Sequence, residues 1–157
     1  MNNPLRAIVI EDQYLLAEAV SDALLKLGCD VLGSAGTVEG GLQLLESHAC
    51  DFAVVDLDLH GEISSPILDL LCSRGIPFLL ATGVFPEDIP NRHRGAVRLT
   101  KPYDMHEIRH ALGILANTSG LACWAQYRSA AAIDGSCSRD ARLAGSLGSP
   151  PTADAKA

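Results

Sequence analysis

The chain is poor in positive charge. It has 12 Lys and Arg residues against 19 Asp and Glu residues, which gives a formal net charge of −7. Proteins that bind nucleic acid through phosphate contacts need a surplus of basic side chains. The acidity of this chain therefore argues against a nucleic-acid partner.

A long hydrophobic run is also missing. No apolar stretch approaches the roughly 18–20 residues that a membrane-spanning helix needs, so we expect no membrane segment and no membrane partner. The first residues, Met1 to Pro4, lead directly into a short apolar run and lack the charged-then-apolar pattern of a signal segment. We therefore expect a cytoplasmic protein.

Cysteine occurs five times and never as a C-x-x-C pair. An odd number without paired spacing indicates neither a zinc site nor a disulfide framework. Cys29, Cys50 and Cys72 fall in apolar helices or at helix–strand junctions. We expect these three to be small buried hydrophobic residues.

The chain does contain enough apolar material for one domain. Its 157 residues are 48% hydrophobic, which suits a globular domain with a sizeable core. From Asn117 onward the composition shifts to Ala, Ser, Gly and Pro, with almost no periodic apolar pattern. We predict a single domain over residues 1–117 and a disordered tail over residues 118–157.

Apolar runs and helical patterns alternate along this domain. The expected strands cover residues 5–10, 29–35, 51–55, 76–81 and 95–99. The expected helices cover residues 13–27 and 38–48, a short segment that opens at Ser64 or Ser65 and stops at Gly75, and residues 103–116. This alternation predicts an α/β fold with a parallel sheet and helices on both of its faces.

Local signals mark helix ends and buried helix faces. Gly28 should stop the first helix, and Thr37 should cap the second. The buried face of the first helix is expected to consist of Leu16, Ala19, Val20, Ala23, Leu24 and Leu27. The last helix is expected to bury Ile108, Leu112 and Leu115.

The helix between the fourth and fifth strands is the missing member of the pattern. Residues 83–94 contain a glycine and two prolines, which leave room for about one helical turn. We therefore expect the fourth helix to be short or replaced by a loop.

Polar side chains follow four of the five apolar strands at the point where each strand ends. Glu11 and Asp12 follow the first, Asp56 the third, Thr82 the fourth and Lys101 the fifth. In a parallel α/β sheet the carboxyl ends of the strands lie along one edge, and ligands bind there. These side chains should therefore converge on one small pocket.

Such a pocket could hold Mg²⁺ and a phosphoryl group. Mg²⁺ prefers oxygen ligands, which three carboxylates and the backbone carbonyl of Asp58 can supply. One carboxylate can accept the phosphoryl group while the metal offsets the charge on the transferring oxygens. Lys101 suits one phosphate oxygen as a compact point charge, and the Thr82 hydroxyl can donate to another. Pro102 predicts a fixed turn after Lys101 that is compatible with a cis bond.

In this order, these residues resemble the receiver domain of two-component response regulators over roughly residues 5–116. The matching features are Glu11-Asp12, Asp56, Thr82 and Lys101-Pro102, each after its own strand. The resemblance implies that Asp56 is the phospho-acceptor, that Glu11, Asp12 and Asp56 hold Mg²⁺, and that Thr82 and Lys101 bind phosphoryl oxygens. It also implies a flavodoxin-like, CheY-like three-layer α/β/α fold with five parallel strands in the order 2-1-3-4-5.

Two departures make the chain look like the FATGUY subgroup of receivers. Arg98 stands three residues before Lys101, where receivers usually have Tyr or Phe, and the fourth helix is lost. Residues 80–85 read Leu-Ala-Thr-Gly-Val-Phe, which places Phe85 in the aromatic slot of the subgroup motif. This resemblance implies a flexible fourth crossover that phosphorylation orders, and a sensor histidine kinase of the HWE type as donor.

The expected function is that of a stand-alone response regulator in phosphorelay signalling. It would be phosphorylated on Asp56 by a sensor histidine kinase or a phosphotransfer protein. Output would pass through a downstream protein partner, with Ile89 to Arg98 and the last helix as the expected partner face, or the chain would act as a phosphate shuttle or sink. It would not be an enzyme beyond self-catalysed phosphorylation and dephosphorylation.

Other interpretations of the same residues stay open at this point. Asp56-Leu57-Asp58 matches the Asp-x-Asp of haloacid-dehalogenase-like phosphatases, although His60 stands where that family has Thr or Val. A pseudo-receiver that binds partners without phosphorylation is the third hypothesis. Within the receiver interpretation, the carboxylate of Asp58 is expected to alter the lifetime of the phosphoryl group, and His60 is expected to be an ordinary loop residue.

Overall fold

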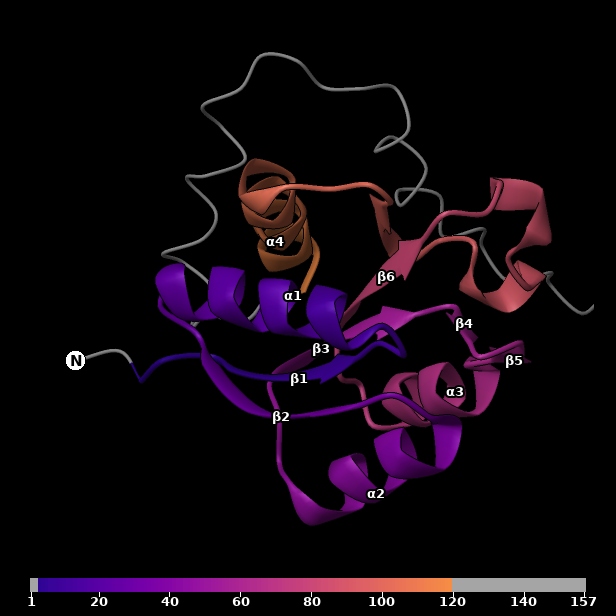
Figure 1. Cartoon of the computed structure of the whole chain (residues 1–157), viewed down its shortest axis with the longest axis horizontal. Coiled ribbons are helices and arrows are strands. Elements are labelled where there is room, and N and C mark those ends of the chain that lie inside the picture. Colours follow the sequence, from indigo (N-terminus) through magenta and orange to yellow (C-terminus); the bar gives the residue numbers. More distant parts are fainter. Residues whose placement is uncertain (1–2, 120–157) are drawn as a thin grey trace, which may run out of the picture.

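A five-stranded parallel sheet forms the centre of the computed structural model, which describes residues 3–119 (Figure 1). The strands stand in the order β2-β1-β3-β6-β7. Their bounds are β1 Arg6–Ile10, β2 Asp30–Ala35, β3 Phe52–Asp56, β6 Phe78–Thr82 and β7 Val97–Thr100. Each neighbouring pair is parallel. Because β6 and β7 are the fourth and fifth strands of this sheet along the chain, the order matches the predicted 2-1-3-4-5. The predicted fold class and strand order are therefore confirmed.

Helices cover both faces of this sheet. α1 (Tyr14–Lys26) and α4 (Met105–Ser119) lie over one face, and α2 (Val38–Ser47) and α3 (Ser65–Ser73) lie over the other (Figure 1). β3 and β6 are buried along their whole length because a parallel sheet with helices on both sides leaves its central strands no contact with water.

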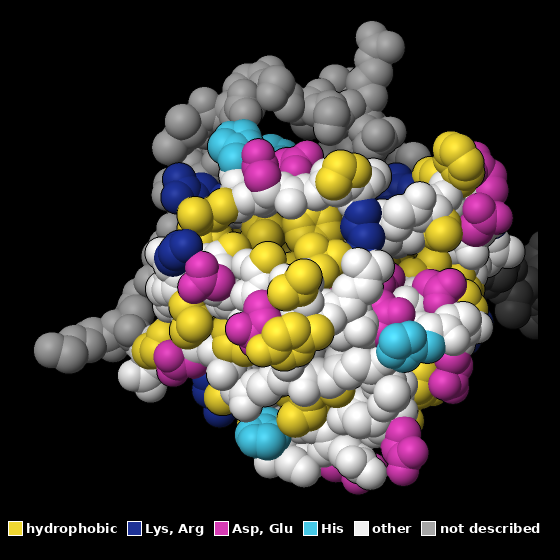
Figure 2. Space-filling view, viewed as in Figure 1, with side chains coloured by type: hydrophobic (Ala, Val, Ile, Leu, Met, Phe, Trp, Pro, Cys, Tyr) yellow, Lys and Arg dark blue, Asp and Glu magenta, His cyan; other side chains and the backbone are white. Residues whose placement is uncertain are grey.

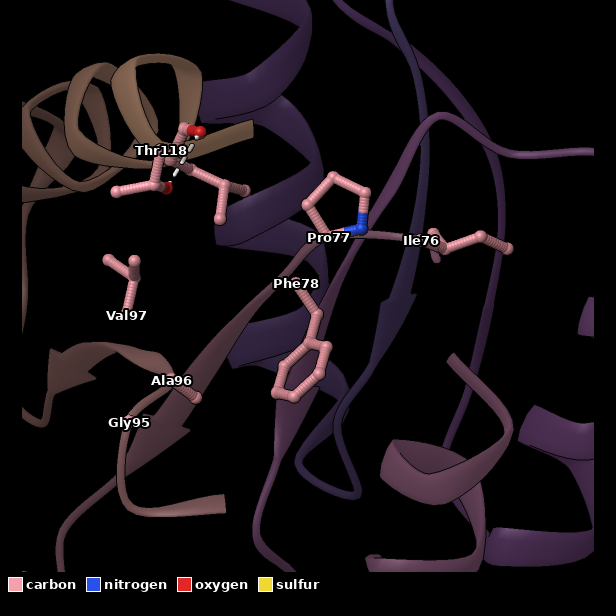
Figure 3. A pocket seen from close by; sticks show the side chains of 8 residues that line it. Ile76, Pro77, Phe78, Gly95, Ala96, Val97 and Thr118 are labelled. Atoms are coloured by element: carbon pink, nitrogen blue, oxygen red, sulfur yellow. Dashed lines mark hydrogen bonds between the residues drawn. The ribbon is translucent and has the colours of Figure 1, made fainter. Parts of the chain in front are cut away.

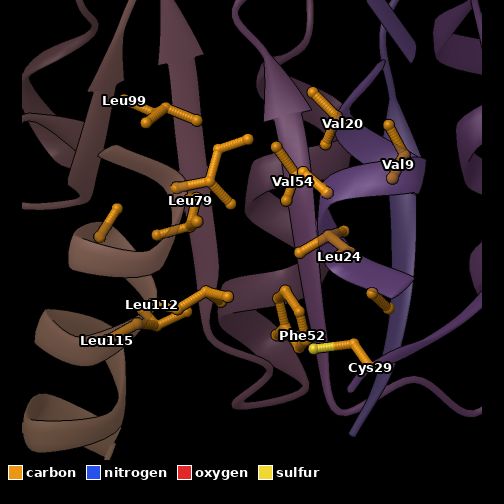
Figure 4. Packing of buried hydrophobic residues seen from close by; sticks show 14 of the residues in the cluster. Val9, Val20, Leu24, Cys29, Phe52, Val54, Leu79, Leu99, Leu112 and Leu115 are labelled. Carbon is orange, nitrogen blue, oxygen red and sulfur yellow. The ribbon is translucent and has the colours of Figure 1, made fainter. Parts of the chain in front are cut away.

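Successive strand residues feed two separate hydrophobic clusters. In β1, Ala7 and Val9 face the α1–α4 layer, whereas Ile8 and Ile10 face the α2–α3 layer. Figure 4 shows the first cluster, where the Phe52 side chain of β3 lies among side chains from the neighbouring strands and α1. The alternation fixes which side of the sheet each helix must cover.

The helix ends follow local sequence signals. The Thr37 hydroxyl accepts a hydrogen bond from the backbone N–H of Gly40 at 3.0 Å and caps α2, as predicted. Gly28 and Gly75 follow α1 and α3 with φ of 85° and 65°, a backbone region that glycine enters without a Cβ penalty. The predicted stops at both glycines are confirmed.

Two short 3-10 turns replace a helix between β6 and β7, as the prolines predicted. They are η1 (Pro86–Asp88) and η2 (Asn91–His93). Ile89, between the turns, is only 1% exposed and joins the α2–α3 cluster. The crossover is therefore irregular but anchored in the core.

A small hairpin after β3 was not predicted. β4 (Asp58–Leu59) pairs antiparallel with β5 (Glu62–Ile63) around the two-residue turn His60-Gly61. Both turn residues have positive φ, 54° and 85°, which is the geometry of the tight turns that suit hairpins. The sequence signal for this hairpin is His60-Gly61 between two polar–apolar pairs, Asp58-Leu59 and Glu62-Ile63.

Some predicted burial is wrong. Cys72 is exposed, whereas Cys29 and Cys50 are buried as expected. In α1 the structure exposes Ala19 and buries Ala17, whereas Val20, Ala23 and Leu24 are buried as predicted and Leu16 and Leu27 are half-buried. Ile108, Leu112 and Leu115 of α4 are buried as predicted.

The predicted domain boundary lies inside the last helix. α4 continues through Asn117 and Thr118 to Ser119, past the expected end at residue 117. The expected disordered tail falls almost wholly on residues 120–157, which lie outside the described residues. None of the helices described between residues 3 and 119 combines the length and apolar character of a membrane span.

Candidate functional site

The strand-end residues predicted from the sequence come together at the carboxyl edge of the sheet. Glu11 and Asp12 follow β1, and Asp56 ends β3. One carboxylate oxygen from each of these three residues lies within 4.8 Å of the other two. Glu11 and Asp56 are buried, with 5% of each exposed, so three acidic groups share one poorly hydrated place.

Lys101 extends into this acidic cluster. Its Nζ lies 2.6 Å from Asp56 Oδ2 and 3.0 Å from Glu11 Oε2. The side chain is 20% exposed, so these contacts are shielded from water far more than a surface ion pair. Lys101 therefore offsets part of the negative charge that the fold gathers at this edge.

Thr82 places a hydroxyl beside Lys101. The backbone N–H of Lys101 donates to the Thr82 carbonyl at 3.0 Å and fixes β7 against β6. The Thr82 Oγ1 accepts from the backbone N–H of Val84 at 3.1 Å, which leaves its own O–H free to donate. Thr82 is 3% exposed, and the Lys101-Pro102 bond is cis.

The pKa values of the carboxyl groups are pushed apart. Burial raises the pKa of Glu11 to about 7, and hydrogen bonds from the Gln13 N–H and from Lys101 oppose this rise. A hydrogen bond with Asp12 and the negative charge of Asp56 add to it. For Asp12, burial also opposes ionisation, but hydrogen bonds with Glu11 and the His60 N–H outweigh it and lower the pKa. One carboxyl thus tends to keep a proton while its neighbour stays charged.

This electrostatic arrangement fits a divalent cation. Burial also works against the charge of Lys101, yet hydrogen bonds and charge from Asp56 and Glu11 raise its pKa, so the lysine stays cationic. Mg²⁺ prefers oxygen ligands and is usually bound through a few carboxylates together with water. Here three carboxylate oxygens lie within 4.8 Å of one another. Glu11, Asp12 and Asp56 therefore suit the metal predicted from the sequence.

The hairpin after β3 is bonded to two of the three carboxylates. The Asp58 N–H donates to Asp56 Oδ1 at 3.2 Å, and the His60 N–H donates to Asp12 Oδ2 at 3.1 Å. The Asp58 carboxylate itself accepts from the Gly61 N–H at 2.6 Å. The sequence interpretation missed His60, because a histidine in a loop carries no periodic or motif signal.

Exposed apolar side chains lie at the same edge of the sheet as the acidic site. Tyr14 and Leu15 begin α1, Val84 and Phe85 follow β6, and Met105 begins α4, all at the carboxyl edge of the sheet. Leu15 is 81% exposed and Phe85 76%. Figure 2 shows hydrophobic and acidic side chains side by side on the face that carries α1. We call these five residues the apolar rim.

A separate crevice of about 270 Å³ lies at the opposite end of the sheet. It is formed where β6 and β7 begin and where α4 ends, with Phe78, Val97 and Thr118 among its lining residues (Figure 3). Its lining is apolar apart from Thr118. The polar side chains predicted to act lie at the carboxyl edge instead.

Comparison with known proteins gives a consistent result. No protein-family model matches the chain. The solved structure of SdrG from Sphingomonas melonis Fr1 is 34% identical, with 73% of this chain and 98% of that chain covered and a TM-score of 0.66. The BeF3-activated conformation of SdrG from Pseudomonas melonis Fr1 is 33% identical, with 71% and 96% covered and a TM-score of 0.61.

More distant relatives share the fold. The REC domain of the PhyR response regulator from Erythrobacter litoralis is 19% identical, with 76% of this chain and 95% of that chain covered and a TM-score of 0.67. The curated transcriptional regulatory protein PdtaR of Mycobacterium tuberculosis is 24% identical over 113 residues, 69% of this chain. The chain spans about half the length of that curated relative, because the match covers 55% of it.

Proposed function

Because the chain belongs to the receiver-domain family of response regulators, we propose that it accepts a phosphoryl group on Asp56 in Mg²⁺-dependent phosphorelay signalling. The donor would be a sensor histidine kinase or a phosphotransfer protein. The receiver fold accounts for the site, since every side chain proposed to act lies at the end of a strand or directly after it.

The surroundings of Asp56 carry this proposal. Its Oδ2 lies 2.6 Å from Lys101 Nζ, and its Oδ1 accepts from the Asp58 N–H at 3.2 Å. The carboxylate is thus held at both oxygens while Glu11 and Asp12 stand beside it. A buried, oriented carboxylate next to a fixed cation is suited to attack on phosphorus.

Each remaining residue has a definable task in the transfer. An oxygen of Asp56 forms a bond to phosphorus as the bond between phosphorus and the donor nitrogen breaks. Lys101 Nζ and the free O–H of Thr82 would hold oxygens of the transferred group. Glu11, Asp12 and Asp56 would hold the metal, with the backbone carbonyl of Asp58 as a fourth proposed ligand. When bound, Mg²⁺ neutralises charge on the transferring oxygens.

The apolar rim favours a protein as donor. A small phosphorylated molecule has no use for exposed Leu15 and Phe85 beside the acidic site, whereas a helical protein surface can cover them. A kinase of the HWE type and a FATGUY-like crossover remain part of the proposal, together with output through a partner protein or as a shuttle or sink. A cytoplasmic location is also part of the proposal.

The phosphatase alternative has less support. That interpretation takes Asp56 and Asp58 as the two acting carboxylates of Asp-x-Asp. Here the Asp58 carboxylate is bonded to the Gly61 N–H at 2.6 Å within the hairpin turn. The complete set of Asp56, Thr82 and Lys101 likewise argues against a pseudo-receiver.

Beryllofluoride, a mimic of the aspartyl phosphate, tests the proposal. We expect saturable, Mg²⁺-dependent binding to the wild-type chain and none to Asp56→Ala. Backbone NMR should show changes in residues 83–98 of the wild type only. Lack of binding by the wild type would overturn the proposal and favour the pseudo-receiver.

A further inference from the structure

His60 touches the acidic cluster twice although it stands in a different element. Its backbone N–H donates to Asp12 Oδ2 at 3.1 Å, and its ring Nδ1 lies 3.3 Å from the same oxygen. The histidine is brought there by its φ of 54°, a conformation that few residues other than glycine adopt. The tight hairpin turn thus brings the backbone N–H and the ring Nδ1 of His60 to the same carboxylate oxygen.

We propose that His60 is a positioning residue that holds the Asp12 carboxylate in the orientation needed for metal binding. This inference rests on the proposed function, because the metal is the one that the phosphoryl transfer requires. Both His60 contacts are made to Oδ2 of Asp12. In this proposal the other oxygen, Oδ1, is the one available to a metal ion shared with Glu11 and Asp56.

Three observations support a positioning role. The Asp12 side chain is 16% exposed, so the carboxylate has few water partners to orient it. The contact spans 48 residues of sequence and therefore depends on the hairpin rather than on a local turn. The same hairpin donates the Asp58 N–H to Asp56, so it orients two neighbouring metal ligands at once. Hydrogen-bonded partners of metal ligands commonly control affinity in this way.

Substitutions at His60 can separate the contribution of the ring from that of the backbone. His60→Gly keeps the N–H donor and tolerates the positive φ but removes the ring. His60→Asn also suits that φ and supplies a side-chain N–H to Asp12. The ring is 67% exposed, so neither change should alter folding. Glu62→Gln, in the same hairpin, serves as the control.

The quantity measured is the Mg²⁺ affinity of the full chain without any phosphodonor. The readout is the change in the amide chemical shifts of residues 11–13 as Mg²⁺ is added. We expect His60→Gly to raise the Mg²⁺ dissociation constant about tenfold. Loss of a residue that hydrogen-bonds a metal ligand typically weakens metal affinity by about 10- to 100-fold, and we expect the lower value because the ring is largely exposed. His60→Asn should recover most of the wild-type affinity. Glu62→Gln should stay within about twofold of wild type, since its carboxylate lies outside the cluster.

Two results would overturn the inference. Unchanged affinity in His60→Gly would show that the ring does not orient Asp12, and tighter binding would show that the ring competes with the metal. Both would leave the proposed function intact if the wild type binds Mg²⁺ and beryllofluoride. A wild type that binds no Mg²⁺ would overturn the inference and the proposed function together.

Discussion

Lys101 holds together carboxylates that would otherwise repel one another. Its Nζ contacts both Asp56 and Glu11, at 2.6 and 3.0 Å, in a part of the molecule where water provides little screening. Breaking a buried ion pair from one side costs more than the pair contributes, because a charge is left without a partner. The contacts of Lys101 with these two carboxylates therefore stabilise the metal-free fold.

Lys101→Met should therefore destabilise the metal-free protein by about 2 kcal/mol, below the full cost of a wholly buried pair because Lys101 is partly exposed. Chemical unfolding in EDTA measures the loss. Added Mg²⁺ should stabilise this variant more than the wild type, since the ion offsets the same carboxylates. Lys26→Met removes an exposed pair with Asp22 in α1 and should change little. Equal losses in both variants would contradict this account.

Glu11 should make the stability of the metal-free protein depend on pH. Its pKa is about 7 in the folded chain against an ordinary value of 4.5, so the folded state binds this proton more tightly than the unfolded state. The resulting stabilisation is complete below about pH 4.5 and is lost as the pH rises through about 7. Thermal unfolding in EDTA between pH 5 and 8 should show this decline in the wild type. Glu11→Gln, which cannot ionise, should show a weaker one.

At the scale of elements, side chains connect the crossover between β6 and β7 to α3. Arg92 donates to both oxygens of Asp69 in α3, at 2.8 and 3.0 Å. His93 Nε2 lies 2.9 Å from Asp69 Oδ1, and the buried His93 ring meets Phe78 edge-on with centroids 6.5 Å apart. The Asp69 carboxylate therefore contacts two side chains of the crossover, Arg92 and His93.

Removing the charge of Asp69 should loosen the crossover without unfolding the domain. In Asp69→Asn we expect faster amide hydrogen exchange over residues 83–96 and unchanged exchange in the sheet, because the sheet does not depend on this contact. Hydrogen-exchange mass spectrometry provides the measurement. Asp22→Asn, which removes an exposed ion pair within α1, is the matched control. Faster exchange throughout the domain would mean that Asp69 supports the whole fold.

At the scale of the whole molecule, the two ends of the sheet differ in kind. The carboxyl edge combines the acidic site with the apolar rim, whereas the amino edge carries an apolar crevice beside the end of α4. Exposed apolar groups next to a reactive site mark a surface that another protein covers. Recognition of the donor and transfer of the phosphoryl group would thus share one edge.

Two substitutions in α1 can test the role of the apolar rim separately from the phosphoryl transfer. Leu15→Asp, at the start of α1, should slow phosphorylation by a sensor kinase at least tenfold, because about 1.4 kcal/mol of lost contact suffices for that factor. Phosphorylation by acetyl phosphate should be unchanged. Leu25→Asp, 55% exposed near the other end of α1, is the control and should affect neither rate. The kinase would be the one in a purified panel that phosphorylates the wild type fastest. Equal slowing with acetyl phosphate would place Leu15 in the chemistry instead.

Much of the fold and the site follows from short-range sequence patterns. Apolar runs that end in Glu11, Asp56, Thr82 or Lys101 predict strands, and parallel pairing then brings those ends together. The prolines of residues 83–94 predict an irregular crossover in the same local way. Glycine at position 75 predicts a helix end because few other residues adopt its φ.

Contacts between distant segments could not be predicted in this way. The exposure of Cys72 and the exchange of Ala17 for Ala19 depend on how each helix is rotated against the sheet. The Lys101–Asp56 and His60–Asp12 contacts join residues 45 and 48 positions apart. Backbone preference and apolar period act over a few residues, so they specify elements. Distances between side chains on different elements, and the pKa values that follow from burial, arise only when those elements are packed together.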